Sequence, residues 1–496
     1  MSTRLSSADA AWLHMDRPTN LMVINSVQLF DEPVDFERIV QVHRERLVDR
    51  YPRFHQRVIE SRLPFQAPRW EEDPDFDIAH HVHHLALPAP GDTRALQELV
   101  GDLMTMPIDR SRPLWHAYVV DGFGDGAALI SRIHHCIADG VVLARVMLSL
   151  TDEEPDPPLI ERADPDRDAR GDATGLAGLA APAARVLGGS ARFAFGAARH
   201  GARAVRSPSH AARLARAIGR DAATAARLLL TPADVATAIK GDPGVSRRVA
   251  WSHPLPLAAI KYAAHAQDAT VNDVLLAAVT GALRHYLQDH DSPVGEIQAM
   301  VPFNLRDLSK PVPAALGNRF GLVFLPLPVG TSGSYRRLVA VHRDMKTIKG
   351  GRDGAVSFGL LSLTGMAPER LERRIIDMFT AKSTAVMTNV PGPVEPVYLA
   401  GVPIRTALVW APTSGHIGMS VSIYSYRGEV TVGLMVDAAL VPDPGEIVTR
   451  LEEEVAAISA LPAHVRRRPG ARARAGTAAA SPKAGRRRGT EEPVGI

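Results

Sequence analysis

The sequence predicts an α/β protein made of two halves of similar size. Residues 1–150 combine a segment of helical periodicity with two strand-like segments around the turn-forming DGFGDG. A comparable mixture of helical and strand-like segments recurs over residues 246–462. Residues 151–245, acidic and Pro-rich at first and then rich in Ala, Arg and Gly, separate the two halves as a linker or lid.

The first half holds the clearest local signals. Apolar side chains at Leu96, Leu99, Val100 and Leu103 have the i, i+3, i+4, i+7 spacing of a helix that is buried on one face. A β-hairpin is predicted next, over LWHAYVVDGFGDGAALISRIHH, and the following VVLARVMLSL has the composition of a helix. The segment HHCIADG, residues 134–140, therefore lies between a strand and a helix.

The second half repeats these signals. Helices are predicted over VNDVLLAAVTGALRHYL and PGEIVTRLEEEVAAIS, and strands over FGLVFLPLPV and VTVGLMV. Residues 463–496 contain too few apolar residues to offset the entropy of ordering, so we expect a disordered basic tail.

Composition and charge limit the classes of function. The chain has 496 residues, of which 46% are hydrophobic and 22% are charged, as in globular proteins. Its formal net charge of +3 hides two basic segments, residues 181–230 and 463–496, so the remaining chain is acidic overall. The first segment predicts either contact with an anionic lipid surface or a solvated helical linker. The arginines of the tail could bind nucleic acid without specificity, but no nucleic-acid-binding module is recognisable.

Several other classes lack their sequence signals. The N-terminal segment interrupts each apolar run with Arg, Asp or His, unlike a signal peptide. No apolar stretch approaches the roughly 18 residues of a membrane-spanning helix. The single cysteine, Cys136, excludes an internal disulfide framework and a Cys-rich zinc or iron–sulfur site. A cytoplasmic protein is the expectation.

The segment HHCIADG is the strongest chemical signal. Adjacent strand residues point to opposite faces, so only one of His134 and His135 can face a given substrate channel. A neutral imidazole suits proton abstraction from a hydroxyl near pH 7, because its ordinary pKa is about 6.5. The alternative is that both are core histidines with satisfied hydrogen bonds.

Further segments accompany this motif: PIDRSRPLW, TVNDVLLA, VPFNLRD, LGNRFG, NVPGP and the opening LSSADAAWLHMDRPTNLM. Together they resemble the bacterial wax ester synthase/diacylglycerol acyltransferase family, over roughly residues 4–150 and 246–460. The HHxxxDG pattern alone is shared with the wider coenzyme A-dependent acyltransferase superfamily, including peptide-synthetase condensation domains. The resemblance implies two chloramphenicol-acetyltransferase-like halves with an active-site tunnel between them.

The resemblance also implies roles for the residues of the motif. His135 would be the general base that deprotonates an acceptor hydroxyl for attack on an acyl-CoA thioester, while His134 would pack or orient. Asp139 would be structural, with Arg306 as its candidate partner. Gly140 would let the backbone turn tightly before the helix.

Three further motifs match the family's pattern. Asn272 and Asp273 would shape the site. An equally plausible interpretation is that they are an ordinary Asn–Asp pair at the start of a helix. Trp115, in PLW with Pro113 and Leu114, would pack rather than react. Asn389 would border the tunnel and is a candidate for a substrate contact.

Weaker constellations favour ordinary structural roles. His80, His81, His83 and His84 could suggest zinc, but alternating strand faces would split them and no Cys or acid lies at ligand spacing. Cys136 would point away from His135, which argues against a Cys–His nucleophile and favours a small core residue. The chain lacks a G-x-S-x-G elbow, a P-loop and G-x-G-x-x-G.

We therefore expect an acyl-CoA-dependent O-acyltransferase that makes triacylglycerol from diacylglycerol, with long-chain alcohols as possible alternative acceptors. Acyl-CoA would be a substrate, and no cofactor or metal is expected. The protein would work at the inner face of the membrane or at lipid droplets without spanning a bilayer. Two alternatives remain open: a superfamily acyltransferase acting on a polyketide or a carrier-bound acyl group, and a non-catalytic lipid-binding protein on the same fold.

Overall fold

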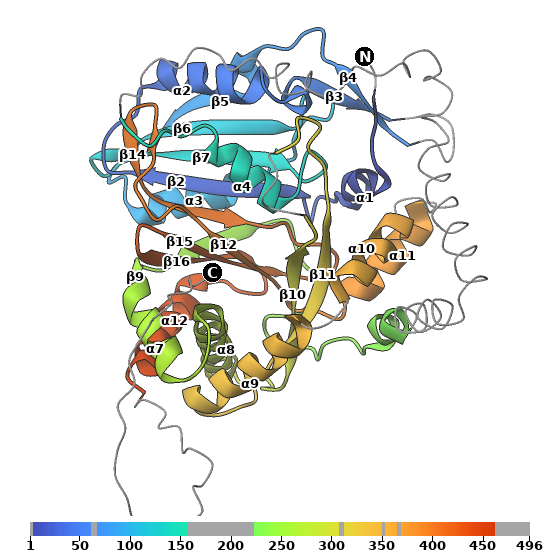
Figure 1. Ribbon diagram of the computed structural model, residues 1–496, viewed down its shortest axis with the longest axis vertical. Coiled ribbons are helices and arrows are strands. Elements are labelled where there is room, and N and C mark those ends of the chain that lie inside the picture. Colours follow the sequence, from blue (N-terminus) through green and yellow to red (C-terminus); the bar gives the residue numbers. More distant parts are fainter. Residues whose placement is uncertain are drawn as a thin grey trace, which may run out of the picture.

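A computed structural model describes residues 3–60, 67–155, 223–306, 312–349, 353–364 and 369–461, without the side chains of residues 355 and 361–370. The predicted disordered tail and most of the predicted linker lie outside these residues. The described chain forms two large β-sheets, one in each spatial half, with helices around them (Figure 1).

The first sheet has six strands in the order β13-β14-β2-β7-β6-β5. Its strands are β2 (Val23–Phe30), β5 (Val82–Ala86), β6 (Trp115–Phe123), β7 (Gly126–His134), β13 (Tyr398–Leu399) and β14 (Val402–Trp410). The predicted hairpin is confirmed as β6 and β7. Strand β14 pairs with β2. The N-terminal sheet thus includes chain from the predicted 246–462 half, and the two spatial halves are linked by this exchange.

The second sheet has the order β11-β10-β12-β15-β16-β8, with β9 also paired to β16. Its strands are β8 (Arg247–Trp251), β9 (Leu255–Pro256), β10 (Ile297–Asn304), β11 (Phe320–Leu327), β12 (Ala385–Pro391), β15 (Met419–Tyr426) and β16 (Glu429–Asp437). The strands predicted from FGLVFLPLPV and VTVGLMV are confirmed as β11 and β16. A small third sheet contains β1 (Thr3–Arg4), β3 (Gln56–Ile59) and β4 (Arg69–Glu72).

Helices form where apolar spacing and capping residues agree. The labelled α-helices are α1 (Ser7–Met15), α2 (Phe36–His43), α3 (Thr93–Thr105), α4 (Gly140–Leu148), α7 (Leu257–Ala266), α8 (Val271–Asp289), α9 (Ser334–Lys349), α10 (Asp353–Thr364), α11 (Glu369–Thr380) and α12 (Pro444–Ser459). In α3, Asp92 caps the first turn and Leu96, Val100 and Leu103 are buried, which confirms the predicted amphipathic helix. Burial of each such side chain stabilises the fold by about 1.5–3 kcal/mol.

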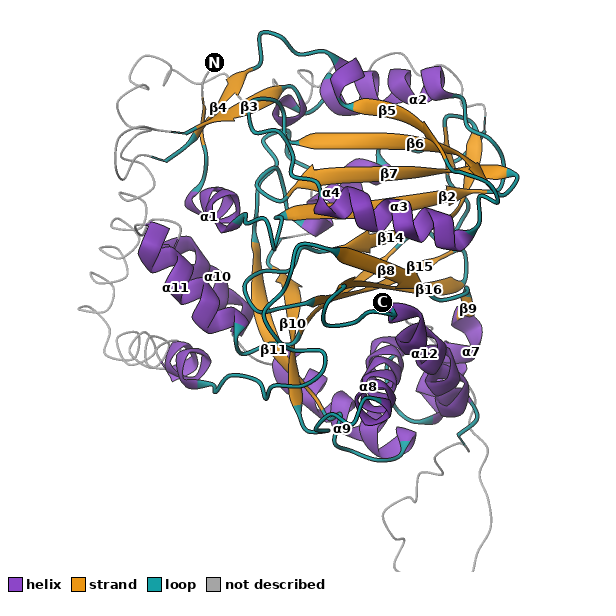
Figure 2. Ribbon diagram, turned by 180° about the vertical axis from the view of Figure 1, so that it is seen from behind, coloured by secondary structure: helices purple, strands orange, loops and turns teal. Residues whose placement is uncertain are grey.

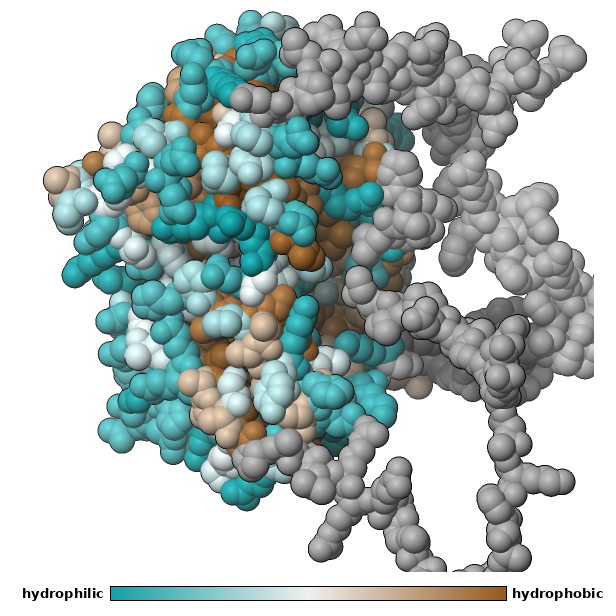
Figure 3. Space-filling view, turned by 60° about the vertical axis from the view of Figure 1, so that its left-hand side comes forward, coloured by the Kyte–Doolittle hydropathy of each residue, from teal (hydrophilic) through white to brown (hydrophobic). Residues whose placement is uncertain are grey.

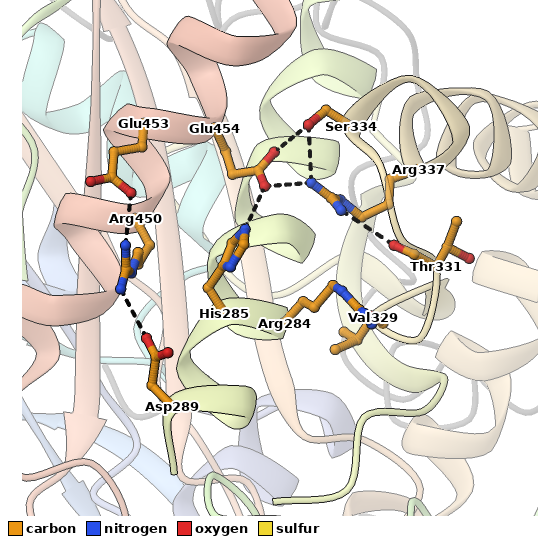
Figure 4. A network of polar contacts seen from close by, with 10 residues as sticks. All are labelled: Arg284, His285, Asp289, Val329, Thr331, Ser334, Arg337, Arg450, Glu453 and Glu454. Atoms are coloured by element: carbon orange, nitrogen blue, oxygen red, sulfur yellow. Dashed lines mark hydrogen bonds and ion pairs between the residues drawn. The ribbon is translucent and has the colours of Figure 1, made fainter. Parts of the chain in front are cut away.

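The helices of the C-terminal half are joined by a buried polar network (Figure 4). The carboxylate of Glu454, on α12, accepts hydrogen bonds from Arg337 at 2.5 Å and from Ser334 at 2.9 Å, both on α9. His285, on α8, lies 3.1 Å from the same carboxylate. Because these groups come from three helices, the network fixes how the helices pack. Removal of one partner would leave a buried charge uncompensated.

Helices α10 and α11 lie beside α1 in both ribbon views (Figures 1 and 2). Two polar contacts join α11 to the N-terminal half. His14 Nδ1 lies 3.1 Å from Glu372 Oε2, and Arg17 Nη1 lies 3.0 Å from Asp377 Oδ1. These contacts bring C-terminal helices next to the turn that carries the two motif histidines.

The surface is mainly hydrophilic, but apolar residues gather near the middle of the face shown in Figure 3. Among the described helices, none has both the length and the apolar character needed to cross a bilayer.

Candidate active site

The segment His134–Gly140 forms the turn between β7 and α4, and it touches both halves of the molecule. Ala138 forms an isolated parallel bridge with Gly317, and the Gly317 N–H donates to the Ile137 carbonyl at 3.2 Å. The sequence thus places the motif at the end of a strand, and the fold places that end against the C-terminal half.

The two histidines have different surroundings. His134 is buried, its Nδ1 accepts a hydrogen bond from the Cys136 N–H at 3.1 Å, and its Nε2 lies 3.8 Å from Asp16 Oδ2. His135 instead lines a cavity. The prediction that only one of the pair faces a substrate channel agrees with this arrangement.

His135 is held as a neutral imidazole. Its ring stacks on Trp12 with centroids 4.0 Å apart, and Phe320 lies 5.4 Å away. Burial lowers the pKa of His135 to about 4, and the nearby Asp139 carboxylate, which favours the protonated form, has a smaller effect. Nδ1 is buried without a hydrogen-bond partner among the described residues, which leaves Nε2 as the nitrogen that can face the cavity.

The cavity has a volume of about 280 Å³ and lies between the two halves. Its wall is mainly apolar and combines Trp12 and Met15 of α1 with Leu322 and Phe324 of β11 and with Phe379 of α11. The lining residues with polar side chains are His135, Asp139, Asn304, Ser357, Thr380, Thr388, Asn389 and Ser414. A mostly apolar cavity with few polar groups is typical of a binding site for a largely hydrophobic ligand.

Asp139 has the surroundings of a structural residue. Its Oδ1 caps α4 by accepting the Val142 N–H at 2.9 Å. Its Oδ2 accepts from Arg306 Nε at 3.2 Å and from the Arg319 N–H at 3.0 Å. Arg306 also donates to the Gly317 carbonyl. The carboxylate therefore fixes the start of α4 and holds it to the C-terminal half.

A second carboxylate, Asp9, supports the motif from the other side. Asp9 Oδ1 accepts from the Asn318 amide at 2.8 Å, and the same amide group donates to the His135 carbonyl at 2.8 Å. Asp9 Oδ2 accepts from Arg53 Nη2 at 3.1 Å, and Arg53 Nη1 donates to the carbonyls of Cys136 and Ile137. Three successive carbonyls of the turn are thereby held by side chains.

Sequence reasoning gave Asp9, Trp12, Arg53 and Asn318 no role. Two signals could have found three of them: Asp9 and Trp12 lie in the opening LSSADAAWLHMDRPTNLM, and Asn318 lies in LGNRFG. Both segments contribute to the family resemblance.

Asn272 and Asp273 make different contacts. Asp273 is buried, forms a capping box with Thr270 at the start of α8, and lies 2.8 Å from His342 Nδ1. Asn272 accepts a hydrogen bond from Asn389 Nδ2 at 2.9 Å. Asn389 lines the cavity. The structure thus brings Asn272 next to Asn389 at the cavity wall, and it places Asp273 in the cap of α8.

The prediction that Gly140 is needed for a tight backbone turn before the helix is wrong. Gly140 is the first residue of α4, its φ is not in the left-handed region, and an added Cβ would meet no atom within 4 Å. The turn therefore needs no glycine, since the backbone there already follows the helix. Gly140 instead lines the cavity.

Trp115 packs in the N-terminal core, as predicted. It is 1% exposed, and its indole N–H donates to the Phe54 carbonyl at 2.8 Å. Cys136 also lies in this core, where burial raises the pKa of its thiol. A thiol that stays protonated is a poor nucleophile, which agrees with the core role expected for Cys136.

The histidines of AHHVHH have separate partners. His81 Nδ1 lies 2.8 Å from the Trp115 carbonyl, His83 Nε2 lies 3.0 Å from His116 Nδ1, and His84 pairs with Asp121 at 2.7 Å. Among the described residues, no group of three or more His, Cys, Asp or Glu has the arrangement of a metal site.

This histidine cluster predicts acid sensitivity of folding. Burial and the neighbouring His81 and His83 lower the pKa of His116 to about 3. The unfolded chain then binds a proton below pH 6.5 that the folded chain does not, so stability is complete above about pH 6.5 and falls as the pH drops toward 3. The loss is at most about 1.4 kcal/mol per pH unit for this residue. Urea unfolding at pH 7 and pH 5 should show a smaller difference for His116→Gln than for the unaltered chain. An equal difference in both would contradict the prediction.

Comparison with known proteins gives matches to two models of one family. Residues 5–275 match the family model of the wax ester synthase/diacylglycerol acyltransferase catalytic domain, and residues 316–459 match the WS/DGAT C-terminal domain. A relative from Mycobacterium tuberculosis, "Probable diacyglycerol O-acyltransferase tgs1", is 28% identical over 92% of this chain and 96% of its own.

Solved structures share the fold. The wax ester synthase/diacylglycerol acyltransferase from Marinobacter aquaeolei VT8 aligns with a TM-score of 0.63 at 23% identity, over 92% of this chain and 98% of its own. The first condensation domain of the calcium-dependent antibiotic synthetase aligns at 0.56 and 17% identity, over 94% and 97%. The chain has the two-lobed chloramphenicol-acetyltransferase-like fold, and it belongs to the wax ester synthase/diacylglycerol acyltransferase family.

Proposed function

We propose that this acyltransferase moves the acyl group of acyl-CoA onto the free hydroxyl of diacylglycerol, giving triacylglycerol, and that long-chain alcohols serve as alternative acceptors. The observation that carries the proposal is the position of His135: a neutral imidazole in an apolar cavity between the two halves. The names of the family and of its mycobacterial relative support the choice of substrates.

The proposed reaction is a direct transfer with no resident cofactor. The acceptor hydroxyl attacks the thioester carbonyl while His135 takes its proton, the C–S bond breaks, and the proton passes to the departing CoA thiolate. A neutral base is ready for this step, and a positioned general base contributes about 10²–10⁴-fold to the rate. The apolar wall excludes water, which would otherwise compete as acceptor.

Four residues act through the backbone in this scheme: Asp139, Arg306, Asp9 and Asn318. They fix the turn at both of its ends and so hold the imidazole in place. Rigid placement matters because small displacements of a reacting group cost rate steeply. Asn389, held by Asn272, is the candidate for a direct contact with substrate.

The test is product analysis with purified protein. Incubation with hexadecanoyl-CoA and dihexadecanoylglycerol should give triacylglycerol and free CoA in equal amounts. The rival acyltransferase function predicts that only a carrier-bound acyl group or a polyketide acceptor is consumed. The non-catalytic alternative predicts lipid binding without product. Either result would overturn the proposal.

A lipid surface is the proposed place of work, because diacylglycerol is almost insoluble in water. On α11, Leu371 and Met378 are 51% and 38% exposed, while Ile376 and Phe379 of the same helix line the cavity. Residues 223–230 form a further helix, whose last carbonyls accept hydrogen bonds from Lys382 just beyond α11. Its Leu229 and Leu230 are 41% and 81% exposed.

We name Leu371, Met378, Leu229 and Leu230 the apolar edge. Of residues 181–230, which the sequence assigns to an anionic lipid surface or to a solvated linker, the structure describes 223–230. Leu228 in this part is buried in the protein. Exposed apolar side chains in segments of the sequence that also contain arginines suit the boundary of an anionic membrane.

Liposome co-flotation should measure how much the apolar edge contributes to lipid binding. Leu230→Asp combined with Met378→Asp is expected to lower co-flotation with anionic liposomes several-fold, because charged groups would have to enter the apolar boundary. Val394→Asp is the matched control, since Val394 is as exposed as Leu230, at 81%. Replacing the arginines of 181–230 by Gln should weaken binding more at low salt than at high salt. Equal binding by all variants at both salt levels would contradict the proposal.

A further inference from the structure

Two carboxylates at the ends of α1 hold the backbone of His135. Near the start of the helix, Asp9 accepts a hydrogen bond from the Asn318 amide, which also donates to the His135 carbonyl at 2.8 Å. Directly after the helix, Asp16 Oδ1 accepts the Met22 N–H at 2.7 Å. The Met22 carbonyl in turn accepts the His135 N–H at 2.7 Å. The position of α1 is therefore fixed relative to the backbone of His135.

Trp12 lies between these two carboxylates, on the same side of α1. It follows Asp9 by three residues and precedes Asp16 by four, which is the spacing of neighbours on one helix face. Its indole is stacked on the imidazole of His135, with the ring centroids 4.0 Å apart and 14° between the planes. Because α1 is anchored on both sides of Trp12, the two rings are held in one arrangement.

Phe320 adds an aromatic ring from the C-terminal half. It is the first residue of β11, and its ring centroid lies 5.4 Å from that of His135 and 5.7 Å from that of Trp12. All three residues line the cavity, and the side of the imidazole that lies under the indole is covered. Trp12 and His135 are only 6% and 4% exposed. The indole therefore limits the access of water to His135.

The indole N–H does not explain why a tryptophan occupies this position. Trp12 Nε1 is buried and has no hydrogen-bond partner among the described residues. Trp12 therefore acts on its surroundings through the flat face of its ring. A phenyl ring can supply such a face, whereas an aliphatic side chain fills part of the space without supplying one.

We propose that Trp12 is a positioning residue for the reaction: its indole fixes the orientation of the His135 imidazole toward the cavity and keeps water from that ring. The inference rests on the proposed function, in which His135 takes the proton of the acceptor hydroxyl. Trp12 itself takes no proton, so its effect on the rate comes through His135. Placement of the base matters because a displacement of about 1 Å can cost about 100-fold in rate.

The kinetic test is Trp12→Leu, which keeps an apolar side chain beside His135 but removes the flat ring. We expect kcat with hexadecanoyl-CoA and dihexadecanoylglycerol to fall about 10–100-fold, while KM for both substrates changes much less. Trp12→Phe should restore most of kcat, because a phenyl ring can still stack on the imidazole. A role as cavity wall alone predicts a raised KM with unchanged kcat in Trp12→Leu, and that result would overturn the inference.

Trp251→Ala is the matched control, because Trp251 is half-buried and lies outside the wall of the cavity. It should leave kcat and KM near those of the unaltered chain. Thermal unfolding shows that each variant is folded before its rates are compared. Equal losses of kcat in Trp12→Leu and Trp12→Phe, or in Trp12→Leu and Trp251→Ala, would overturn the inference.

Hydrogen–deuterium exchange at the imidazole C2 separates this inference from the proposed reaction, since it requires no turnover. The exchange passes through the imidazolium and needs contact with water, and mass spectrometry with fragmentation between His134 and His135 resolves the two rings. At pH 8, Trp12→Ala should speed exchange at His135 several-fold, and Trp12→Phe should change it little. This result supports the positioning role even if no triacylglycerol forms. Unchanged exchange in a folded Trp12→Ala protein overturns it even if the enzyme is active.

Discussion

His135→Ala is expected to lower turnover by about 10²–10⁴-fold in a protein that still folds, because the variant loses the base but keeps the backbone contacts of the turn. Those contacts, the hydrogen bonds of the His135 N–H and carbonyl, do not depend on the side chain. Steady-state rates with acyl-CoA and diacylglycerol, together with thermal unfolding, measure both quantities.

His134→Ala is the comparison for this prediction. Its side chain accepts the Cys136 N–H and lies near Asp16, so its loss should lower the melting temperature as well as the rate. A folded His135→Ala protein with near-normal activity would exclude His135 as the base.

Asp139→Asn should reduce both stability and activity. The amide can still cap α4 through its oxygen, but its NH₂ group cannot accept from Arg306 and from the Arg319 N–H. Asp139 is 2% exposed, and breaking such a buried ion pair costs about 3–5 kcal/mol. Urea unfolding and kcat/KM should therefore fall together.

Asp125→Asn provides the control for this substitution, since Asp125 is exposed in the turn between β6 and β7. An Asp139→Asn protein that is inactive but as stable as the unaltered chain would mean that the carboxylate acts directly in catalysis.

The local features of the fold were predictable from the sequence. The helix around Val100, the hairpin before His134 and the helix after Gly140 follow from periodicity and turn residues that lie close together in the chain. The pairing of β14 with β2 was not predictable in this way. It joins segments far apart in sequence, and neither strand carries a local signal that names its partner.

The candidate site also combines residues with a local sequence signal and contacts between distant segments. The spacing of HHCIADG, together with the family resemblance, singled out His135, Asp139 and Arg306, and the structure brings these three into one site. Their catalytic roles stay predictions. The supports from Asp9 and Asn318 escaped because a buried carboxylate on α1 acquires its task only when the C-terminal half packs against it. Gly140 was misinterpreted because its conformation was inferred from residue type alone.

The central claim, that a neutral and desolvated His135 is the base, is tested most directly by the pH dependence of kcat/KM. Because burial lowers the pKa of His135 to about 4, activity should stay constant as the pH falls through 6.5 and decline only toward pH 4, measured over times in which the protein stays folded. The residual activity of His135→Ala should lack this decline. A decline centred near pH 6.5, or the same profile in His135→Ala, would contradict the claim.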